Sequence, residues 1–342
     1  MDKQESLLKV NKLKKYFPIQ RGFFKKNVGT VKAVDDVSFD IYKGEILGLV
    51  GESGCGKSTL GKCILNLIKP TTGERFLRLD DRYLNLELMS REETREYRKA
   101  VQMIFQDPHS SLNPHMTVYE ILREPLLLLN NEKDSSKIQS QIENIINMVG
   151  LKPEHLVRYP HSFSGGQRQR IGLARAIITR PKLVVADEPV SALDVSIQAQ
   201  ILNLLKEMKD INELTFLFIT HDLAVVRYIC DRIIVMYLGH IVEVGTKEEI
   251  LNSPMHPYSY ALLQVIPKGD KSLLGSRRLL QGELPDPVNI PSGCVFHPRC
   301  PHCRDICRTE IPEPIEKNGR VVKCHFPLPE GEPRLCDPME NR

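Results

Sequence analysis

The sequence lacks any apolar stretch long enough to cross a membrane. Its apolar runs, such as Ile46–Val50 and Pro125–Leu129, fall far short of the roughly 20 residues that a membrane-spanning helix needs. The N-terminal segment MDKQESLLKV contains no apolar stretch of signal-peptide length. Tryptophan is absent, and the net charge of +4 is too small by itself to indicate a nucleic acid partner. We therefore expect a soluble chain that is not exported, binds no nucleic acid and reaches a membrane only through partner proteins.

Cysteines are concentrated at one end of the chain. Cys55, Cys63 and Cys230 are scattered through the first 293 residues, and the other six cysteines crowd the last 49. In a chain without an export signal, such a cluster indicates metal more often than disulfides. The six are Cys294, Cys300, Cys303, Cys307, Cys324 and Cys336.

Strands and helices alternate along the first three quarters of the chain. Short apolar runs predict buried strands, and segments with helical spacing of leucine and isoleucine predict helices between them. This order predicts an α/β fold with a parallel sheet and an all-helical insertion at about 107–180. A proline-rich, irregular appendage is expected at 256–342, after a first domain at 1–255. The expected strands are Glu45–Val50, Val101–Phe105, Leu183–Ala186, Leu214–Thr220 and a hairpin of Ile233–Tyr237 with His240–Val244. The expected helices include one through Ile68, two or three within Thr117–Gly150 with a break near Asn130–Ser136, then Ser164–Thr179 and Val195–Met208.

A complete P-loop pattern, GESGCGKS, follows the first apolar strand and precedes a helix. Glycines let the backbone amides turn inward and surround phosphates. Lys57 can then reach the β- and γ-phosphates, and the Ser58 hydroxyl can bind Mg²⁺. The sequence therefore predicts a site for a nucleoside triphosphate with Mg²⁺. Its expected contacts are Gly51, Ser53, Gly54, Cys55, Gly56, Lys57, Ser58 and Thr59.

Polar residues stand at the ends of other predicted strands. Asp187 and Glu188 end one strand, about 130 residues after the P-loop, and Gln106 and His221 follow two more. The carboxyl ends of parallel strands meet at one edge, where open α/β sheets bind ligands. We expect Asp187 to hold Mg²⁺ through water and Glu188 to polarise the attacking water. His221 would lie where it could contact the γ-phosphate.

A second anion site is predicted at the start of another helix. A serine and two glycines precede this helix, where backbone N–H groups and the helix dipole favour phosphate. The P-loop does not need such a site for its own nucleotide, so it is expected to serve another subunit's ATP. Its residues are Ser164, Gly165, Gly166 and Gln167.

With these motifs, about residues 7–250 resemble the nucleotide-binding subunits of ABC transporters, although Phe163 stands where the signature motif usually begins with Leu. The resemblance implies a mixed sheet with an N-terminal antiparallel β part. It makes Gln106 the glutamine that senses Mg²⁺ and the membrane subunit, and His221 the switch histidine. It also places Asp194 in a loop that crosses the dimer interface, and an aromatic residue, Tyr16 or alternatively Phe17, on the adenine.

A closer resemblance, to the ATPases of dipeptide and oligopeptide importers, extends to about residue 325. It is carried by RYPHSFSGG, DEPVSALDVS, HPYSYALL, GELP from Gly282, and GCVFHPRCP from Gly293. It implies a peripheral ATPase on the cytoplasmic face of a prokaryotic membrane, hydrolysing MgATP in a head-to-tail dimer. The implied partners are a second, homologous ATPase chain, two transmembrane permeases and, indirectly, an extracytoplasmic substrate-binding protein. Importers of this group also serve nickel or other small solutes.

The cysteine spacing in the tail suits either tetrahedral Zn²⁺ or a [4Fe–4S] cluster, and free or disulfide-bonded thiols are the third alternative. In relatives that carry this tail, cysteines matching Cys294, Cys300, Cys307 and Cys324 bind a [4Fe–4S] cluster. Cys303 departs from their pattern and makes the local run look more like a zinc site. A structural role is expected in either case.

Two other classes of function compete with transport. Soluble ABC ATPases of DNA repair carry a long coiled coil, but only about 105 residues without sustained heptads separate Gly56 from Phe163. Those of translation carry two cassettes in tandem, whereas this chain has one P-loop. A redox- or metal-sensing regulator that uses the tail as its input is the third class.

Overall fold

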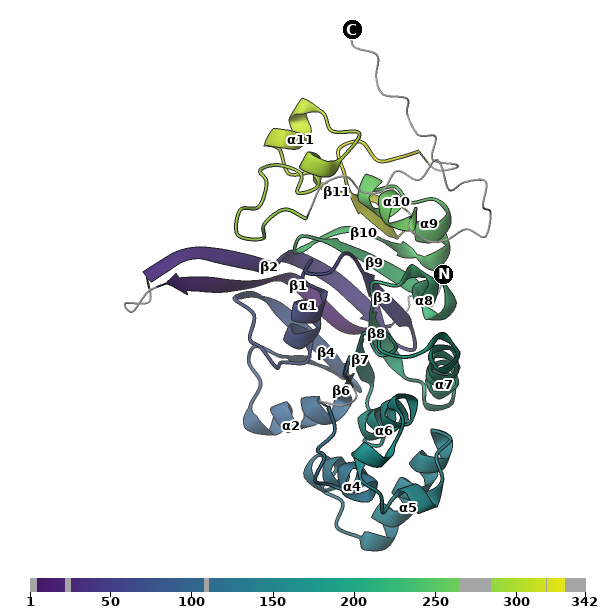
Figure 1. Ribbon diagram of the computed structural model, residues 1–342. Helices are drawn as coiled ribbons and strands as arrows, with labels where there is room; N and C mark the ends of the chain where they lie inside the picture. Colours follow the sequence, from purple (N-terminus) through teal and green to yellow (C-terminus); the bar gives the residue numbers. More distant parts are fainter. Residues whose placement is uncertain (1–4, 22–25, 108–110, 265–283, 318, 330–342) are drawn as a thin grey trace. The chain divides into compact units, whose positions relative to one another are not determined.

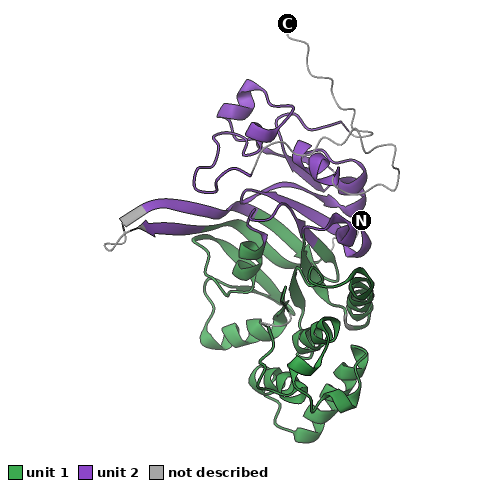
Figure 2. Cartoon of the chain, viewed as in Figure 1, with its two compact units in different colours: residues 1–15, 38–47, 58–220 green, residues 16–37, 48–57, 221–342 purple. Residues whose placement is uncertain are grey.

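The computed structural model describes most of the chain as two compact units, which Figure 2 shows in different colours. Gly282, Glu283 and Cys336 lie outside the described residues. The described residues are 5–21, 26–107, 111–264, 284–317 and 319–329. Unit 1 comprises residues 1–15, 38–47 and 58–220, and unit 2 comprises residues 16–37, 48–57 and 221–342.

Parallel strands form the centre of unit 1. Strand β7 (Leu183–Asp187) pairs in parallel with β6 (Val101–Ile104) on one side and with β8 (Thr215–Ile219) on the other. All residues of β7 and β8 are buried, as expected where helices cover both faces of a parallel sheet. Strand β3 (Ile46–Val50), the neighbour of β8, runs along the chain from unit 1 into unit 2. The four predicted strands are therefore present.

A second, antiparallel sheet has the order β2-β1-β4-β5. Leu8 of the first strand lies opposite Leu77, and the side chains of both are fully buried. The buried Arg75 donates to the carboxylate of Glu87 over 2.8 Å and to the carbonyl of Cys63. The expected antiparallel N-terminal part is therefore present. Its strands are β1 (Ser6–Arg21), β2 (Lys26–Tyr42), β4 (Thr72–Leu79) and β5 (Arg82–Asn85).

The predicted helical insertion is built from helices with well-defined N-caps. Thr117 caps α4 (Val118–Leu128) through a reciprocal capping box with Glu120, and Asp134 caps α5 (Ser135–Met148). The break between these helices covers residues 129–134 and overlaps the segment Asn130–Ser136 near which it was predicted. They gather with α6 (Gly165–Ile177) in one part of unit 1 (Figure 1). Unit 1 also contains α2 (Arg91–Ala100), α7 (Val195–Asn212), most of α1 (Lys57–Ile64) and the single turns η1 (Pro153–His155) and η2 (Pro160–Ser162).

Helix α1 is shorter than predicted. The sequence suggested a helix through Ile68, but α1 ends at Ile64. Asn66 has φ 54°, and this left-handed conformation does not continue a helix.

Unit 2 contains an antiparallel sheet that extends into the C-terminal region. The predicted hairpin is present as β9 (Arg232–Tyr237) and β10 (His240–Thr246). Strand β10 also pairs with β12 (Arg320–Lys323), which in turn pairs with β11 (Pro314–Lys317). The region from residue 256 was expected to be irregular, and that expectation is wrong for these strands. Short helical elements complete the unit: α8 (Leu223–Ile229), α9 (Lys247–Asn252), α10 (Pro257–Leu263), η4 (His297–Arg299) and α11 (Asp305–Thr309).

A buried ion pair reinforces the β10–β12 pairing. The Arg320 guanidinium donates to the Glu243 carboxylate over 2.7 Å, and both side chains are buried. Glu243 also accepts from the backbone N–H groups of Met255 and His256 over 2.7 and 3.1 Å. A buried charge needs such partners to offset its desolvation.

Among the helices of the described residues, none is both long enough and apolar enough to span a bilayer.

Candidate functional site

Two glycines of the P-loop are required by close backbone approaches within unit 2. Gly51 and Gly56 have φ values of 155° and 106°, which residues with a side chain rarely adopt. A Cβ at Gly51 would collide with the carbonyl oxygen of Met236, and one at Gly56 with that of Ala33. The sequence motif therefore corresponds to a backbone that only glycine can form at these positions.

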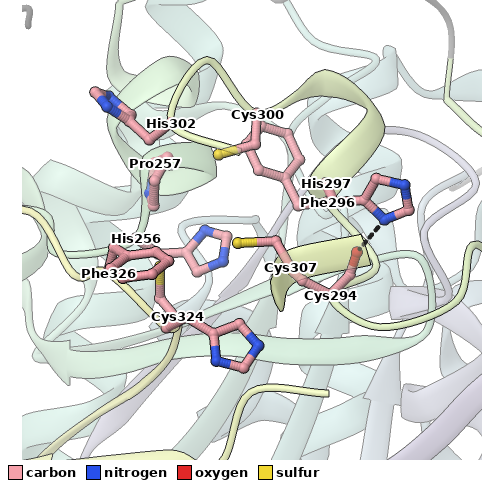
Figure 3. A pocket seen from close by; sticks show the side chains of 11 residues that line it. His256, Pro257, Cys294, Phe296, His297, Cys300, His302, Cys307, Cys324 and Phe326 are labelled. Atoms are coloured by element: carbon pink, nitrogen blue, oxygen red, sulfur yellow. Dashed lines mark hydrogen bonds between the residues drawn. The ribbon is translucent and has the colours of Figure 1, made fainter. Parts of the chain in front are cut away.

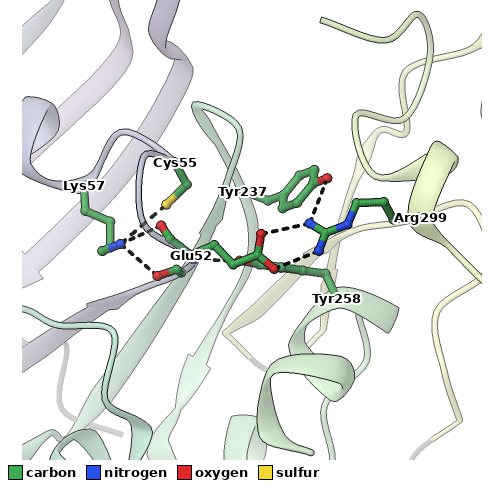
Figure 4. Close-up of polar contacts among 7 residues, drawn as sticks. Glu52, Cys55, Lys57, Tyr237, Tyr258 and Arg299 are labelled. Atoms are coloured by element: carbon green, nitrogen blue, oxygen red, sulfur yellow. Dashed lines mark hydrogen bonds and ion pairs between the residues drawn. The ribbon is translucent and has the colours of Figure 1, made fainter. Parts of the chain in front are cut away.

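The Lys57 ammonium group turns back onto its own loop. It donates to the carbonyl oxygens of Gly51 and Glu52, each over 2.8 Å, and lies 3.8 Å from Cys55 Sγ (Figure 4). Burial raises the pKa of the Cys55 thiol. The carbonyls hold a positive charge in the loop, where an incoming phosphate would meet it.

Ser58 and Asp187 meet within unit 1. The Ser58 hydroxyl at the start of α1 donates to Asp187 Oδ1 over 3.1 Å, and the Asp187 side chain is buried at the end of β7. A hydroxyl and a carboxylate are oxygen ligands of the kind that Mg²⁺ prefers, with water and substrate phosphates completing its octahedron. The P-loop serine and the strand-end aspartate, which the sequence places far apart, are therefore neighbours.

Gln106 and Glu188 are also in contact. The Gln106 amide donates to Glu188 Oε2 over 3.0 Å, just beyond the ends of β6 and β7. Glu188 has φ 46°, in the left-handed region that costs a residue with a side chain about 1–2 kcal/mol. Such strain is concentrated at functional sites, where the surrounding structure maintains it.

Ser164 starts helix α6 with a reciprocal capping box. Its hydroxyl accepts from the Gln167 N–H over 3.3 Å, and its own N–H donates to Gln167 Oε1 over 3.0 Å. A Cβ at Gly166 would lie 2.5 Å from Ile197 Cγ2 on α7, so these helices approach closely. Asp194, the N-cap of α7, is exposed. The loop therefore presents an ordered helix N-terminus, as the sequence predicted.

Of the remaining predicted residues, Thr59 lies in helix α1 of unit 1, and the others lie in unit 2: Ser53, Gly54, Tyr16, Phe17 and His221. His221 is exposed and lies two residues after the end of β8. The Tyr16 hydroxyl donates to Asp35 Oδ1 over 2.5 Å, and burial together with this carboxylate raises the pKa of Tyr16. Phe17 is exposed. The choice between the two aromatic residues stays a prediction.

Comparisons with known proteins agree with this geometry. The model of the ABC transporter family matches residues 34–191, and that of the oligopeptide/dipeptide transporter C-terminal region matches residues 242–307. The oligopeptide transport ATP-binding protein AppF of Bacillus subtilis is 50% identical, with 94% of this chain and 98% of AppF covered. The oligopeptide transport ATP-binding protein OppF of Escherichia coli is 48% identical, with 90% of this chain and 92% of OppF covered. The chain belongs to the oligopeptide/dipeptide family of ABC transporter ATPases. Its ATP hydrolysis is coupled to transport.

Solved structures support the ABC ATPase fold. A dimeric ATP-binding cassette in a post-hydrolysis state with ADP and Pi matches with a TM-score of 0.61 at 27% identity. The match covers 70% of this chain and 98% of that cassette. A component of an ABC transporter complex from Clostridium perfringens matches with a TM-score of 0.60 at 25% identity, over 72% and 91% of the two chains.

In this ABC ATPase the four expected cysteine ligands line one small cavity (Figure 3). Cys303 does not line it, and its Sγ lies 3.7 Å from the carbonyl of Arg304. Burial, together with the neighbouring thiols, raises the pKa of Cys300 to about 12 and that of Cys324 to about 11. The lining residues are Cys294, Cys300, Cys307 and Cys324 with His256, Pro257, Phe296, His297, His302, His325 and Phe326.

The sequence suggested that this region binds a metal, and the structure does not support that expectation. Within the described residues, no three His, Cys, Asp or Glu side chains are arranged to hold a metal ion. A tetrahedral zinc site needs four ligands at about 2.0–2.3 Å from one point. Among the residues that the structure describes, neither the zinc site nor the [4Fe–4S] cluster that the sequence suggested is therefore supported.

Sequence reasoning missed one contact of the P-loop. Arg299 donates to both carboxylate oxygens of Glu52, over 2.8 and 3.1 Å. These residues are 247 positions apart, and no pattern connects them. One chemical feature of the sequence could have suggested the contact. A carboxylate in a phosphate-binding loop repels phosphate unless a cation lies beside it, so Glu52 indicates a cationic partner.

Proposed function

We propose that the chain is the ATP-binding subunit of a peptide importer, peripheral at the cytoplasmic face of the membrane. The similarity to oligopeptide transport ATP-binding proteins over almost the whole chain is the observation that carries this proposal. The match to the C-terminal region of such transporters supports it. We place the boundary between the ATPase domain and the C-terminal region near residue 255.

In the proposed mechanism, P-loop amides and Lys57 bind the triphosphate, and Ser58 and Asp187 would hold Mg²⁺, which neutralises phosphate charge. Glu188 orients and polarises the attacking water as general base. The Gln106 amide, which donates to Glu188, keeps its carboxylate directed toward the site. His221 contacts the γ-phosphate, and Tyr16 stacks on the adenine.

A second ATPase chain completes the site in this proposal. The α6 N-terminus at Ser164–Gln167 binds the phosphates of the ATP held by the partner's P-loop, and Asp194 lies at the dimer interface. Similarity to a dimeric cassette supports this arrangement. We propose a homologous but different partner chain, two permeases that the dimer drives, and a separate binding protein that supplies the peptide.

Uptake by cells tests the cargo. Deleting the gene from the source organism should abolish uptake of a labelled oligopeptide, and the wild-type gene should restore it. Lys57→Ala should fail to restore uptake, because the triphosphate loses its main cationic contact. Unchanged peptide uptake together with lost nickel uptake would reject the peptide cargo in favour of the nickel alternative.

We also propose that Cys294, Cys300, Cys307 and Cys324 hold a [4Fe–4S] cluster. These thiols line one cavity that aromatic side chains flank (Figure 3), and Cys303 is not among the lining residues. Four cysteine thiolates are the ligand set that holds such a cluster, and these four side chains would supply it.

Anaerobic purification tests the cluster. The wild-type chain should show broad visible charge-transfer absorption and about four irons per chain. Cys307→Ser should lose both, whereas the matched variant Cys303→Ser should keep both. One zinc per chain without visible absorption would contradict the proposal.

A further inference from the structure

An arginine of the C-terminal region holds the second residue of the P-loop within unit 2. Arg299 Nη1 and Nη2 donate to the two carboxylate oxygens of Glu52 over 2.8 and 3.1 Å (Figure 4). The Arg299 side chain is 7% exposed and that of Glu52 24%. Two parallel charge-assisted bonds in a largely buried setting fix both the position and the orientation of the carboxylate.

The backbone of Glu52 is held from two further directions. Its N–H donates to the Tyr258 hydroxyl over 2.9 Å, and its carbonyl accepts from Lys57 Nζ over 2.8 Å. Tyr258 belongs to α10, outside the P-loop. The side chain, N–H and carbonyl of this one residue therefore each have a defined partner.

Aromatic packing anchors the arginine. The Tyr237 hydroxyl accepts from Arg299 Nη1 over 3.5 Å, and the guanidinium lies 5.9 Å from the centre of the Tyr237 ring. That ring packs 4.6 Å from Tyr258 and 5.2 Å from Phe296, measured between ring centres. Phe296 lies three residues before Arg299 and is fully buried. The arginine is therefore packed against the same aromatic core as Tyr258.

The Arg299 guanidinium next to Glu52 matters because the P-loop binds a triphosphate. The P-loop receives a polyanion, and an unpaired carboxylate in the same loop repels it. A paired guanidinium neutralises that charge and directs the carboxylate away from the amides that bind phosphate. Arginine suits this role better than lysine, because its planar fork matches both carboxylate oxygens.

We propose that Arg299 is a positioning residue for ATP binding: it neutralises Glu52 and fixes the P-loop, so that the C-terminal region sets the affinity for ATP. The inference rests on the ATPase activity of the chain and is independent of the transported cargo.

Calorimetric titration of the purified full-length chain with MgATP tests the proposal. Arg299→Ala should weaken binding by roughly tenfold, because removing one partner leaves the other charge unpaired. The MgATP affinity of Arg299→Lys should lie between that of Arg299→Ala and that of the wild type. Arg308→Ala removes the same charge from an exposed position of the same region, and its affinity should equal that of the wild type.

Glu52→Gln separates charge compensation from loss of folding. Without the carboxylate, the arginine is no longer needed, so Glu52→Gln with Arg299→Ala should bind within about twofold of Glu52→Gln alone. The defect of Arg299→Ala should also shrink as salt rises, since screening weakens the repulsion. A purely structural role predicts neither rescue nor salt dependence.

The proposal is overturned if Arg299→Ala binds MgATP as tightly as Arg308→Ala. It is also overturned if the double variant binds no better than Arg299→Ala. Should Arg299→Ala fail to fold by circular dichroism, the affinities of Arg299→Lys and wild type decide the outcome, and equal values reject the proposal. Loss of ATP binding by the wild type itself would instead contradict the ATPase assignment.

Discussion

Glu188 combines a strained backbone with a polar partner at the end of strand β7. Its φ of 46° places it in the left-handed region, and its Oε2 accepts from the Gln106 amide over 3.0 Å. The preceding residue, Asp187, is buried and bonded to Ser58. Adjacent carboxylates therefore have separate environments, one suited to holding a cation and the other to orienting water.

Replacing Glu188 by Gln should leave ATP binding intact and reduce turnover by about 10²–10⁴-fold, because the amide cannot accept a proton from water. Affinity from calorimetry and phosphate release from the assembled transporter check the two halves of this prediction. The exposed Glu207→Gln in the same unit serves as control and should behave as wild type. Normal turnover by Glu188→Gln would show that another group is the base.

At the same scale, sequence patterns predicted contacts only where a motif states the chemistry. Ser58 and Asp187 could be paired in advance because the P-loop and a strand-end carboxylate have known geometric roles. The Glu52–Arg299 contact could not be predicted in this way. Arginine is common on surfaces, and nothing in the sequence of 342 residues identifies Arg299 as the partner of Glu52. By contrast, Cys303 departs from the ligand pattern that the family resemblance implies, and in the structure it does not line the cavity that the other four cysteines share.

Among the elements, helix α6 shows most directly how packing constrains a helix N-terminus that we propose binds phosphate. It contains Gly166, where an added Cβ would lie 2.5 Å from Ile197 Cγ2, and Gly172, where an added Cβ would meet nothing within 4 Å. The two glycines occupy the same helix and differ in what surrounds them. They therefore form a matched pair for substitution.

Gly172→Ala should stabilise the chain by about 0.5–1 kcal/mol, since alanine restricts the unfolded chain and fits the helix. Gly166→Ala should instead push α6 away from α7 and reduce the ATPase activity of the transporter at least tenfold. ATP affinity of the isolated chain should remain unchanged in both variants, because neither touches the P-loop. Thermal unfolding, calorimetry and phosphate release provide the measurements. Equal activity of the two variants would contradict the account of this helix.

Elements with local signals were predicted well, and those that depend on distant partners were not. Thr117 and Asp134 cap helices that were expected from apolar spacing, and Ser164 caps the helix that was expected to begin at this serine. Strands β11 and β12 have four residues each, and all residues of β11 are exposed. They exist because β10 provides an edge for pairing, which no local pattern in the tail reveals.

On the scale of the whole molecule, the chain forms two compact units, and segments distant in sequence contribute to each. The division into units falls within the P-loop motif, with Lys57 assigned to unit 2 and Ser58 to unit 1. The relatives match over nearly their full length, so the C-terminal region belongs to the same kind of subunit as the ATPase part. In our account this subunit is incomplete alone, because its second phosphate-binding helix serves a partner's ATP.

Sedimentation velocity of the Glu188→Gln chain tests this shared site most directly. The chain is measured with MgATP or MgADP, alone and with an equimolar second ATPase subunit of its transporter. The account predicts a dimer that forms with MgATP and not with MgADP in at least one of these mixtures, and its loss when Gly166→Asp is added. Monomers in every mixture, with MgATP binding shown intact by calorimetry, would contradict the shared site.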